Sequence, residues 1–427
     1  MQVKLAYGRK GLNLDLPEGV ALIEPRFLPG LADEAQTLRD GLRNPIGTQA
    51  LRKMVQPGNS VVIVHTDITR ATPNDRILPV LISELENAGI QPEDITLLNG
   101  LGTHRRQTDA ELRQMLGEKL AKQYRCLQHD CKDDANLVSL GKTSLGHPVR
   151  INRAYLEADV KILTGFIEPH FFAGFSGGPK AVLPSLAGEE SVFTNHGHRM
   201  VAHPKATWGV TAGNPIWEEM RETALMTQPD FLLNVALNTQ HEITGVFAGE
   251  LLLAHQQGCA FVKETAMAPV DQPYDFAITT NSGYPLDQNL YQSVKGMSAA
   301  ARVVRPGGAI IMAAACEDGL PDHGLYAQLL AEAGSPERIL EMIADPEFEA
   351  QDQWQVQIQA QIQQQADVYV YAEGLTDKQI EAALFHPCRD IEQLVTKLSS
   401  TKGPRGCVIP AGPQVIPYLR DNFSEGC

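Results

Sequence analysis

The sequence contains no long apolar run, and no stretch approaches the roughly 18 residues that a membrane-spanning helix requires. Its first residues, MQVKLAYGRKGLNLDLPEG, lack the basic segment and the following apolar core that are typical of a secretory signal. We therefore expect a cytoplasmic protein that does not bind a membrane.

Basic residues are few relative to acidic ones. The chain has 36 Lys and Arg against 51 Asp and Glu, which gives a formal net charge of −15. This balance disfavours a broad positive surface and therefore argues against nucleic acid as a partner. Any anionic ligand must be held by a few local cations.

Cysteine motifs are also absent, because the seven cysteines are scattered and none forms CxxC. Cys126 and Cys131 are close together but lack a matching second pair, so the spacing favours reduced thiols over a zinc site or disulfides. The chain also lacks the HExxH and GxxxxGK[ST] spacings, which disfavours a zincin or a P-loop.

What is present indicates a globular enzyme of more than one domain. The chain has 427 residues, of which 43% are hydrophobic and 20% charged, and single cores rarely exceed about 250 to 300 residues. Short apolar runs alternate with helical patterns, as in the strand 59–67, the helix 74–89 and the strand 95–100. Such alternation predicts an α/β fold with parallel strands and flanking helices.

The pattern repeats after residue 270. Strands are expected at 160–166 and 231–237, a helix at 250–266, and then APVDQPYD (268–275), whose two prolines and lack of periodicity suggest a linker. A second α/β series follows. The Gln-rich segment 351–366 has Trp354, Ile358 and Ile362 at four-residue spacing, which predicts an amphipathic helix.

We therefore predict two domains, each with a mostly parallel or mixed sheet flanked by helices and with the active site in the crevice between them. Residues 1–270 form the first domain and residues 271–427 the second. The tail 405–427 could pack on either domain.

Four segments carry candidate chemistry, and three of them follow predicted strands. HTDITRATP offers Asp67 and Arg70 on a loop entering a helix, where an anion could bind, although a helix cap with a surface arginine explains them equally. NGLGTHRRQT displays His104 at a strand end as a candidate base, or as a solvated loop histidine.

The other two segments are richer in unusual residues. FIEPHFFAGFSGGPKAVLPS (166–185) combines His170 with a small-residue loop that ends on Lys180, which could bind phosphate or act as a nucleophile, the alternative being a Gly-rich turn. TNHGHRMVAHP carries His196, His198 and His203, which could ligate a metal or be partly structural.

These segments resemble the motifs of the lactate racemase family. DITR (67–70), GTH (102–104), HFFAGFSGGPK (170–180), NH (195–196) and LYQSVKG (290–296) occur in the family's order, and the resemblance extends from about residue 10 to about residue 410. It implies an isomerase, a racemase or epimerase of a 2-hydroxy acid, that uses a nickel-pincer nucleotide made by separate biosynthetic enzymes.

The resemblance also implies roles for individual residues. Lys180 would attach the nucleotide covalently through a thioamide, and His196 would be the protein ligand to nickel. His104 and His170 would act as acid and base on opposite faces of a transient 2-keto acid. Further positions around the cofactor or substrate would be Asp67, Ile68, Thr69, Arg70, Gln292 and Lys295, with Arg70, Lys295, Tyr291 and Trp354 facing the substrate.

One departure and two alternatives accompany this interpretation. The family commonly has a glycine where this chain has Ser185 in LPS, which could change the geometry of the loop. A zinc-dependent hydrolase that uses His196, His198 and His203 is a first alternative. The second is a non-catalytic carrier of the nickel nucleotide, which would need Lys180 but not His104 or His170.

Overall fold

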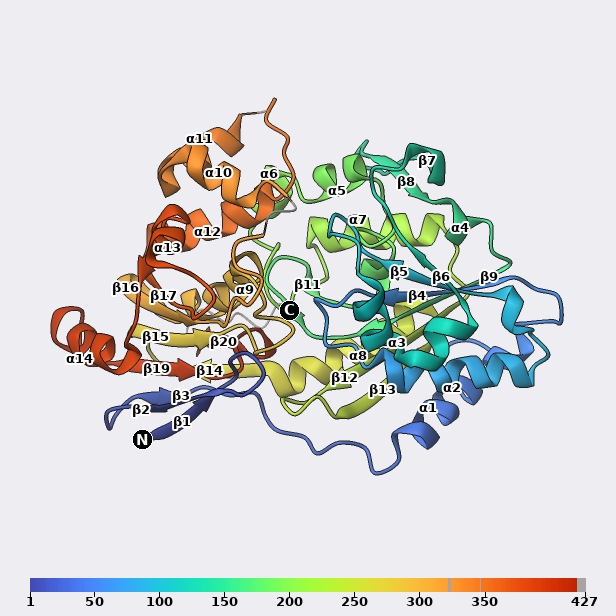
Figure 1. Ribbon diagram of the computed structural model, residues 1–427, viewed down its shortest axis with the longest axis horizontal. Coiled ribbons are helices and arrows are strands. Elements are labelled where there is room, and N and C mark those ends of the chain that lie inside the picture. The colour runs from blue at the N-terminus through green and yellow to red at the C-terminus, as the bar shows by residue number, and fades with distance from the viewer. Residues whose placement is uncertain (322–323, 346, 421–427) are drawn as a thin grey trace.

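The computed structural model describes residues 1–321, 324–345 and 347–420, and in this part of the chain it contains two six-stranded sheets with helices on their faces (Figure 1). The predicted fold class is confirmed, because each sheet is wholly or mostly parallel. The described cysteines are free thiols, as expected. Among the described helices, none combines the length and the apolar character needed to cross a membrane.

The first sheet is parallel except for one antiparallel edge strand. Its strands lie in the order β13 (Ile243–Gly249), β12 (Phe231–Leu237), β9 (Val160–Phe166), β4 (Val61–Thr66), β5 (Ile95–Gly100) and β6 (Arg125–Gln128). One face is covered by α1 (Glu34–Arg43), α2 (Asn74–Asn87) and α3 (Asp109–Gln123), and the other by α7 (Pro215–Met226) and α8 (Leu251–Ala266). Because both faces are covered, strands such as VVIV in β4 are apolar throughout.

The second sheet is parallel throughout. Its order is β18 (His386–Pro387), β17 (Ala366–Tyr371), β16 (Val304–Ala313), β15 (Tyr274–Thr280), β19 (Gly406–Ile409) and β3 (Ala21–Leu22). The helices α9 (Leu290–Ala301) and α12 (Gln353–Gln365) pack on one face, and α14 (Ile391–Thr401) packs on the other together with the hairpin β1 (Gln2–Leu5) and β2 (Leu12–Asp15).

The first 22 residues therefore belong with the second sheet. β3 pairs with β19, and the β1–β2 hairpin, dark blue in Figure 1, lies beside that sheet. The chain then crosses to the first sheet, where α1 begins. The predicted single boundary near residue 270 assigns these residues to the first domain instead. The sequence does not reveal that they join the second sheet, because the two-residue strand β3 leaves almost no periodic pattern.

Two further expectations need correction. The supposed linker 268–275 contains most of β14 (Met267–Val270), which pairs in parallel with β20 (Ile416–Leu419), and the first residues of β15. The helix predicted over 351–366 is present as α12, but it is not amphipathic, since residues 353–360 are all buried. Its glutamines are accommodated by hydrogen bonds, such as the one from Gln359 Nε2 to the carbonyl oxygen of Ala383 at 2.8 Å.

The remaining elements are short. They are β7 (Leu137–Lys142), β8 (Pro148–Asn152), α4 (Arg153–Leu156), β10 (Pro169–His170), β11 (Gly174–Phe175), α5 (Glu189–Asn195), α6 (His198–Val201), α10 (Tyr326–Ala333), α11 (Pro336–Ala344) and α13 (Asp377–Ala382).

Candidate active site

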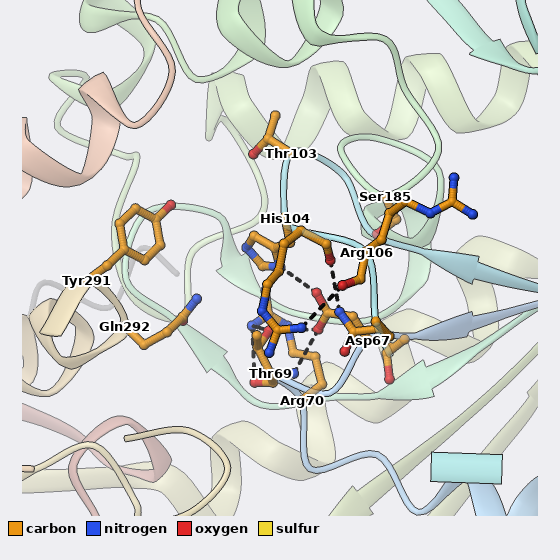
Figure 2. Close-up of polar contacts among 12 residues, drawn as sticks. Asp67, Thr69, Arg70, Thr103, His104, Arg106, Ser185, Tyr291 and Gln292 are labelled. Atoms are coloured by element: carbon orange, nitrogen blue, oxygen red, sulfur yellow. Dashed lines mark hydrogen bonds and ion pairs between the residues drawn. The ribbon is translucent and has the colours of Figure 1, made fainter. Parts of the chain in front are cut away.

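A cavity lies at the carboxyl ends of β4, β5 and β9 and is closed on its other side by α9 and α12 of the second domain. Ten of the residues singled out in the sequence line it: Asp67, Arg70, His104, His170, Lys180, His196, Tyr291, Gln292, Lys295 and Trp354. Figure 2 shows Asp67, Arg70 and His104 on one side and Tyr291 and Gln292 on the other. The predicted crevice between the domains is therefore where these side chains meet.

Asp67 and His104 form a hydrogen-bonded pair from two neighbouring strand ends. Nδ1 of His104 donates to Oδ2 of Asp67, while Oδ1 of Asp67 accepts from the backbone nitrogen of Thr69 at 3.0 Å and from its hydroxyl at 2.7 Å (Figure 2). Burial would raise the pKa of Asp67, but the adjacent His104 and Arg70 outweigh it and hold that pKa well below its usual range. A carboxylate held in this way fixes the ring of His104 and leaves its Nε2 as a proton acceptor.

His170 has the opposite tautomer. The backbone nitrogen of Ala173 donates to its Nδ1 at 3.2 Å, so the neutral ring carries its proton on Nε2. His170 is buried against Phe171 and Phe172, and burial, followed by the charge of Lys180, lowers its pKa well below the usual range. The two predicted acid–base residues thus lie in one cavity with different protonation at Nε2.

Lys180 is a half-buried lysine in the 3-10 turn Gly178–Ala181. Burial, reinforced by the charge of Arg70, lowers its pKa to about 7, so a large fraction of the amine is neutral near pH 7. A neutral amine is the form that can attack an acyl or thioacyl carbon. The cavity therefore presents the kind of nucleophile that a covalently attached cofactor needs.

The glycines before Lys180 are packed against protein atoms on one side. Gly177 and Gly178 have φ values of +75° and +52°, and a Cβ added to them would lie 2.5 Å from Asn234 Oδ1 and 2.4 Å from the ring of His255. Protein atoms therefore fill the space on this side of the loop, while Gly177 itself lines the cavity.

Glu168 is a buried carboxyl that the sequence analysis missed. It lies between β9 and β10, two residues before His170, and only 8% of it is exposed. Burial raises its pKa, while Lys295, Arg70 and Lys180 oppose the rise. The only indication of Glu168 in the sequence was its place in the tripeptide EPH (168–170), just after a predicted strand.

The cations around the cavity suit an anionic ligand. Besides Arg70 and Lys180 there is Lys295, whose Nζ donates to Gln292 Oε1 at 2.6 Å. Burial, followed by the charge of Arg70, lowers the pKa of Lys295 well below its usual range. A bound carboxylate or phosphate would offset the charge of Arg70 that helps to lower the pKa values of these two lysines.

His196 is held by aromatic rings and has an unused nitrogen. Its ring meets Phe172 and Trp354 edge-on at 5.0 and 5.1 Å between centroids, and Trp354 in turn donates from Nε1 to the hydroxyl of Tyr291 at 2.9 Å. The buried Nδ1 of His196 has no hydrogen-bond partner among the described residues. An imidazole with an orphaned nitrogen at a cavity wall fits a metal ligand.

The alternative of a three-histidine zinc site is not supported by the described residues. His203 is exposed, and its Nδ1 accepts a hydrogen bond from the backbone nitrogen of Lys205 at 3.2 Å. In the described residues no three His, Cys, Asp or Glu side chains lie close enough together to hold a metal ion. Of the three histidines, only His196 lines the main cavity.

Three other residues complete the comparison with the sequence. Ile68 and Thr69 line a smaller neighbouring cavity rather than the main one. Ser185 lines the main cavity, and its hydroxyl donates to the carbonyl oxygen of Lys180 at 2.8 Å. Ser185 is not among the described residues with positive φ, so a serine at this position causes no backbone strain.

Comparison with known proteins agrees with this geometry. The family model described as the lactate racemase N-terminal domain matches residues 7–209, and the lactate racemase C-terminal domain matches residues 270–416. The chain belongs to the lactate racemase family. It is therefore an isomerase by family.

Individual relatives give the same result. The lactate racemase of Thermoanaerobacterium thermosaccharolyticum is 33% identical, with 97% of this chain and 98% of that protein covered. The lactate racemase of Lactiplantibacillus plantarum is 39% identical, with 75% and 76% covered.

Solved structures agree as well. The T. thermosaccharolyticum lactate racemase apoprotein superimposes with a TM-score of 0.89 at 33% identity, covering 98% of this chain and 100% of that chain. A Thermotoga maritima protein, at 19% identity and a TM-score of 0.72, covers 92% of this chain and 100% of its own and shares the fold.

Proposed function

We propose that this protein interconverts the two configurations at C2 of a 2-hydroxy acid, using a nickel-pincer nucleotide attached to Lys180. The observation that carries the proposal is that an Asp67-supported His104, a second histidine and a lysine amine of lowered pKa line one cavity. The printed names of both relatives make lactate the first substrate to test.

The residues of the cavity fit such a cofactor. Lys180 would hold it covalently, and the orphaned Nδ1 or the other ring nitrogen of His196 would bind the nickel. Asp67 on one side and Gln292 on the other would contact it, while Ile68 and Thr69 would lie behind Asp67, where they line the smaller neighbouring cavity. When bound, the cofactor supplies an acceptor that takes a hydride from C2 and returns it to either face.

The remaining polar groups act on the substrate. Arg70, through its charge, and Lys295, through an N–H donor, would bind its carboxylate, since both line the same cavity, and Tyr291 and Trp354 would close the apolar side. His104, with Nε2 free, would take the proton of the C2 hydroxyl, and Asp67 would stabilise the resulting imidazolium.

His170 would serve the other configuration. At rest its Nε2 carries a proton and can donate a hydrogen bond to a substrate oxygen. To accept a proton at Nε2, the neutral ring must carry its own proton on Nδ1 and give up the bond from Ala173. The two histidines therefore exchange roles between the two directions of the reaction.

The test is intact mass and nickel content of protein co-produced with the cofactor-biosynthesis enzymes, for wild type and Lys180→Ala. We expect a lysine-dependent mass adduct with one nickel per chain, and chiral chromatography should show racemisation of D- or L-lactate or another 2-hydroxy acid. A wild type without adduct and nickel, in a host in which the T. thermosaccharolyticum relative is loaded, would overturn the proposal.

Substitution of either His104 or His170 distinguishes an enzyme from a non-catalytic carrier of the nickel nucleotide. His104→Gln and His170→Gln should keep the adduct and the nickel but lose racemisation by roughly 10²- to 10⁴-fold. Full exchange of substrate configuration in both variants would contradict the roles assigned to them.

A further inference from the structure

The loop that carries Lys180 is fixed from behind by two buried residues that do not line the cavity. Asn234 comes from β12 and His255 from α8, and their exposed fractions are 0% and 1%. Both lie on the side of the first sheet that faces the loop, because Asn234 alternates with Leu233, which packs on the opposite face.

Each residue makes a directed contact with the loop. Oδ1 of Asn234 accepts a hydrogen bond from the backbone nitrogen of Gly178 at 2.8 Å. Nε2 of His255 lies 2.9 Å from the carbonyl oxygen of Ser176, and since a carbonyl only accepts, the histidine carries its proton there. The backbone atoms on both sides of Gly177 are therefore tied to the core.

His255 is itself held in one orientation. Its ring stacks on that of Trp217 with an interplanar angle of 13°, and its Nδ1 lies 3.7 Å from the thiol of Cys259 one turn further along α8. Burial lowers the pKa of His255 to about 4, so the ring is neutral at pH 7 and keeps the Nε2 proton. Gly178 lies directly against this ring, where only a hydrogen atom fits.

We propose that Asn234 and His255 are positioning residues that hold Ser176–Gly178 in the conformation from which Lys180 reaches the cofactor. The backbone nitrogen of Lys180 donates to the carbonyl oxygen of Gly177 at 3.2 Å, so the turn that carries the amine is built on the clamped glycine. This inference rests on the proposed attachment of the nucleotide at Lys180.

The hydrogen bonds that Asn234 and His255 make with the loop, here called the clamp, affect the protonation of Lys180 as well as its position. Lys180 lines the cavity beside Arg70, and a loop free to move would let the amine turn further toward solvent and be protonated. A fixed backbone keeps the amine in the cavity in its reactive form. Small displacements of a reacting group are costly, since an error of about 1 Å can reduce a rate by roughly 100-fold.

The experiment compares His255→Leu with His255→Gln, whose amide nitrogen can replace the Nε2 donor, and with Val262→Ala as a matched loss of packing on the same helix. Hydrogen–deuterium exchange of residues 175–183 is measured in the full-length protein made without the biosynthetic enzymes. Mass-adduct occupancy at Lys180 is measured after co-production with those enzymes, and the melting temperature is recorded for each variant.

We expect His255→Leu to exchange in the loop on the order of tenfold faster than wild type and to carry the adduct on a severalfold smaller fraction of chains. His255→Gln should approach wild type in both measurements. Val262→Ala should lower the melting temperature without either effect. Asn234→Ala, which removes the acceptor for Gly178, should reproduce His255→Leu, and it replaces that variant if His255→Leu does not fold.

Two results would overturn the inference. One is loop exchange and adduct occupancy in His255→Leu that equal those of Val262→Ala; the other is a His255→Gln protein as impaired as His255→Leu. A wild-type loop that exchanges slowly but carries no adduct would have another meaning. It would support the clamp and reject the attachment of the cofactor at Lys180.

Discussion

His104 Nδ1 donates to Asp67 Oδ2 across 37 residues of sequence, and this bond joins the loops that follow two adjacent strands. β4 and β5 are parallel neighbours, with Thr66 opposite Gly100, so their carboxyl ends bring the two loops together at one edge of the sheet. The pair gives a histidine of fixed orientation whose free nitrogen faces a cavity. That is the arrangement of a general base with a supporting carboxylate.

Asp67→Asn should reduce kcat for racemisation by roughly 100-fold, at the low end of what a positioned acid–base group contributes. The amide can still accept a hydrogen bond, but it lacks the charge that stabilises protonated His104. Rates are measured by chiral chromatography on protein with full nickel content. Thr69→Val is the control: it removes one of two bonds to Oδ1 of Asp67 and should cost less than about tenfold. Equal losses in both variants would contradict a charge effect.

Acetylation of Lys180 by an N-hydroxysuccinimide ester should show an apparent pKa near 7 in the protein without cofactor, because desolvation and the charge of Arg70 lower the pKa of this amine. Arg70→Gln should raise this pKa, since a positive neighbour is removed, and Glu168→Gln should lower it, since a negative one is removed. Peptide mass spectrometry follows the modification, with exposed Lys119 as the internal reference. Shifts of the same sign in both variants would contradict the assigned charges.

The site could be predicted from the sequence to the extent that its residues directly follow strands. β5, β9 and β12 begin and end where the apolar runs do, and the polar residues next to these ends, such as His104 and His170, therefore fall at the mouth of the crevice. Site residues from the second domain, such as Lys295, were predicted only through the motif resemblance. Local sequence patterns contain no information on long-range contacts.

Buried polar residues that support other groups could not be predicted from the sequence. Glu168, Glu219 and His255 lie in segments whose periodicity is that of ordinary elements, and only the packed structure shows which polar groups they face. The sequence also does not show that Asn234 and His255 fill the space beside Gly177 and Gly178. β3 was missed because a strand of two residues has no period.

Glu219→Gln should weaken the retention of nickel without removing the adduct at Lys180. Glu219 is 2% exposed; its Oε2 accepts from Asn195 Nδ2 at 2.8 Å, next to His196, and its Oε1 lies 2.7 Å from His147 Nδ1. Loss of a group that hydrogen-bonds a metal ligand directly commonly costs 10- to 100-fold in affinity, and because Glu219 acts on His196 only through Asn195, we expect a loss of about tenfold or less. Nickel remaining after dialysis against a chelator gives the readout. Glu222→Gln, on the same helix but hydrogen-bonded to exposed Ser144, should behave as wild type.

Stability should fall as the pH drops from 6.5 toward 4, because burial lowers the pKa values of His65 and His255 to about 4. In this range the unfolded chain binds protons at these histidines and the folded chain does not, so each can cost up to about 1.4 kcal/mol per pH unit. Asp352, whose pKa burial raises to about 6, acts in the opposite direction and offsets part of the loss. His255→Gln should therefore show a smaller decrease of its urea midpoint between pH 6.5 and pH 5 than wild type, while His203→Gln, at an exposed position, should match wild type. Parallel midpoints for all three proteins would mean that His255 does not titrate differently in the folded and unfolded states.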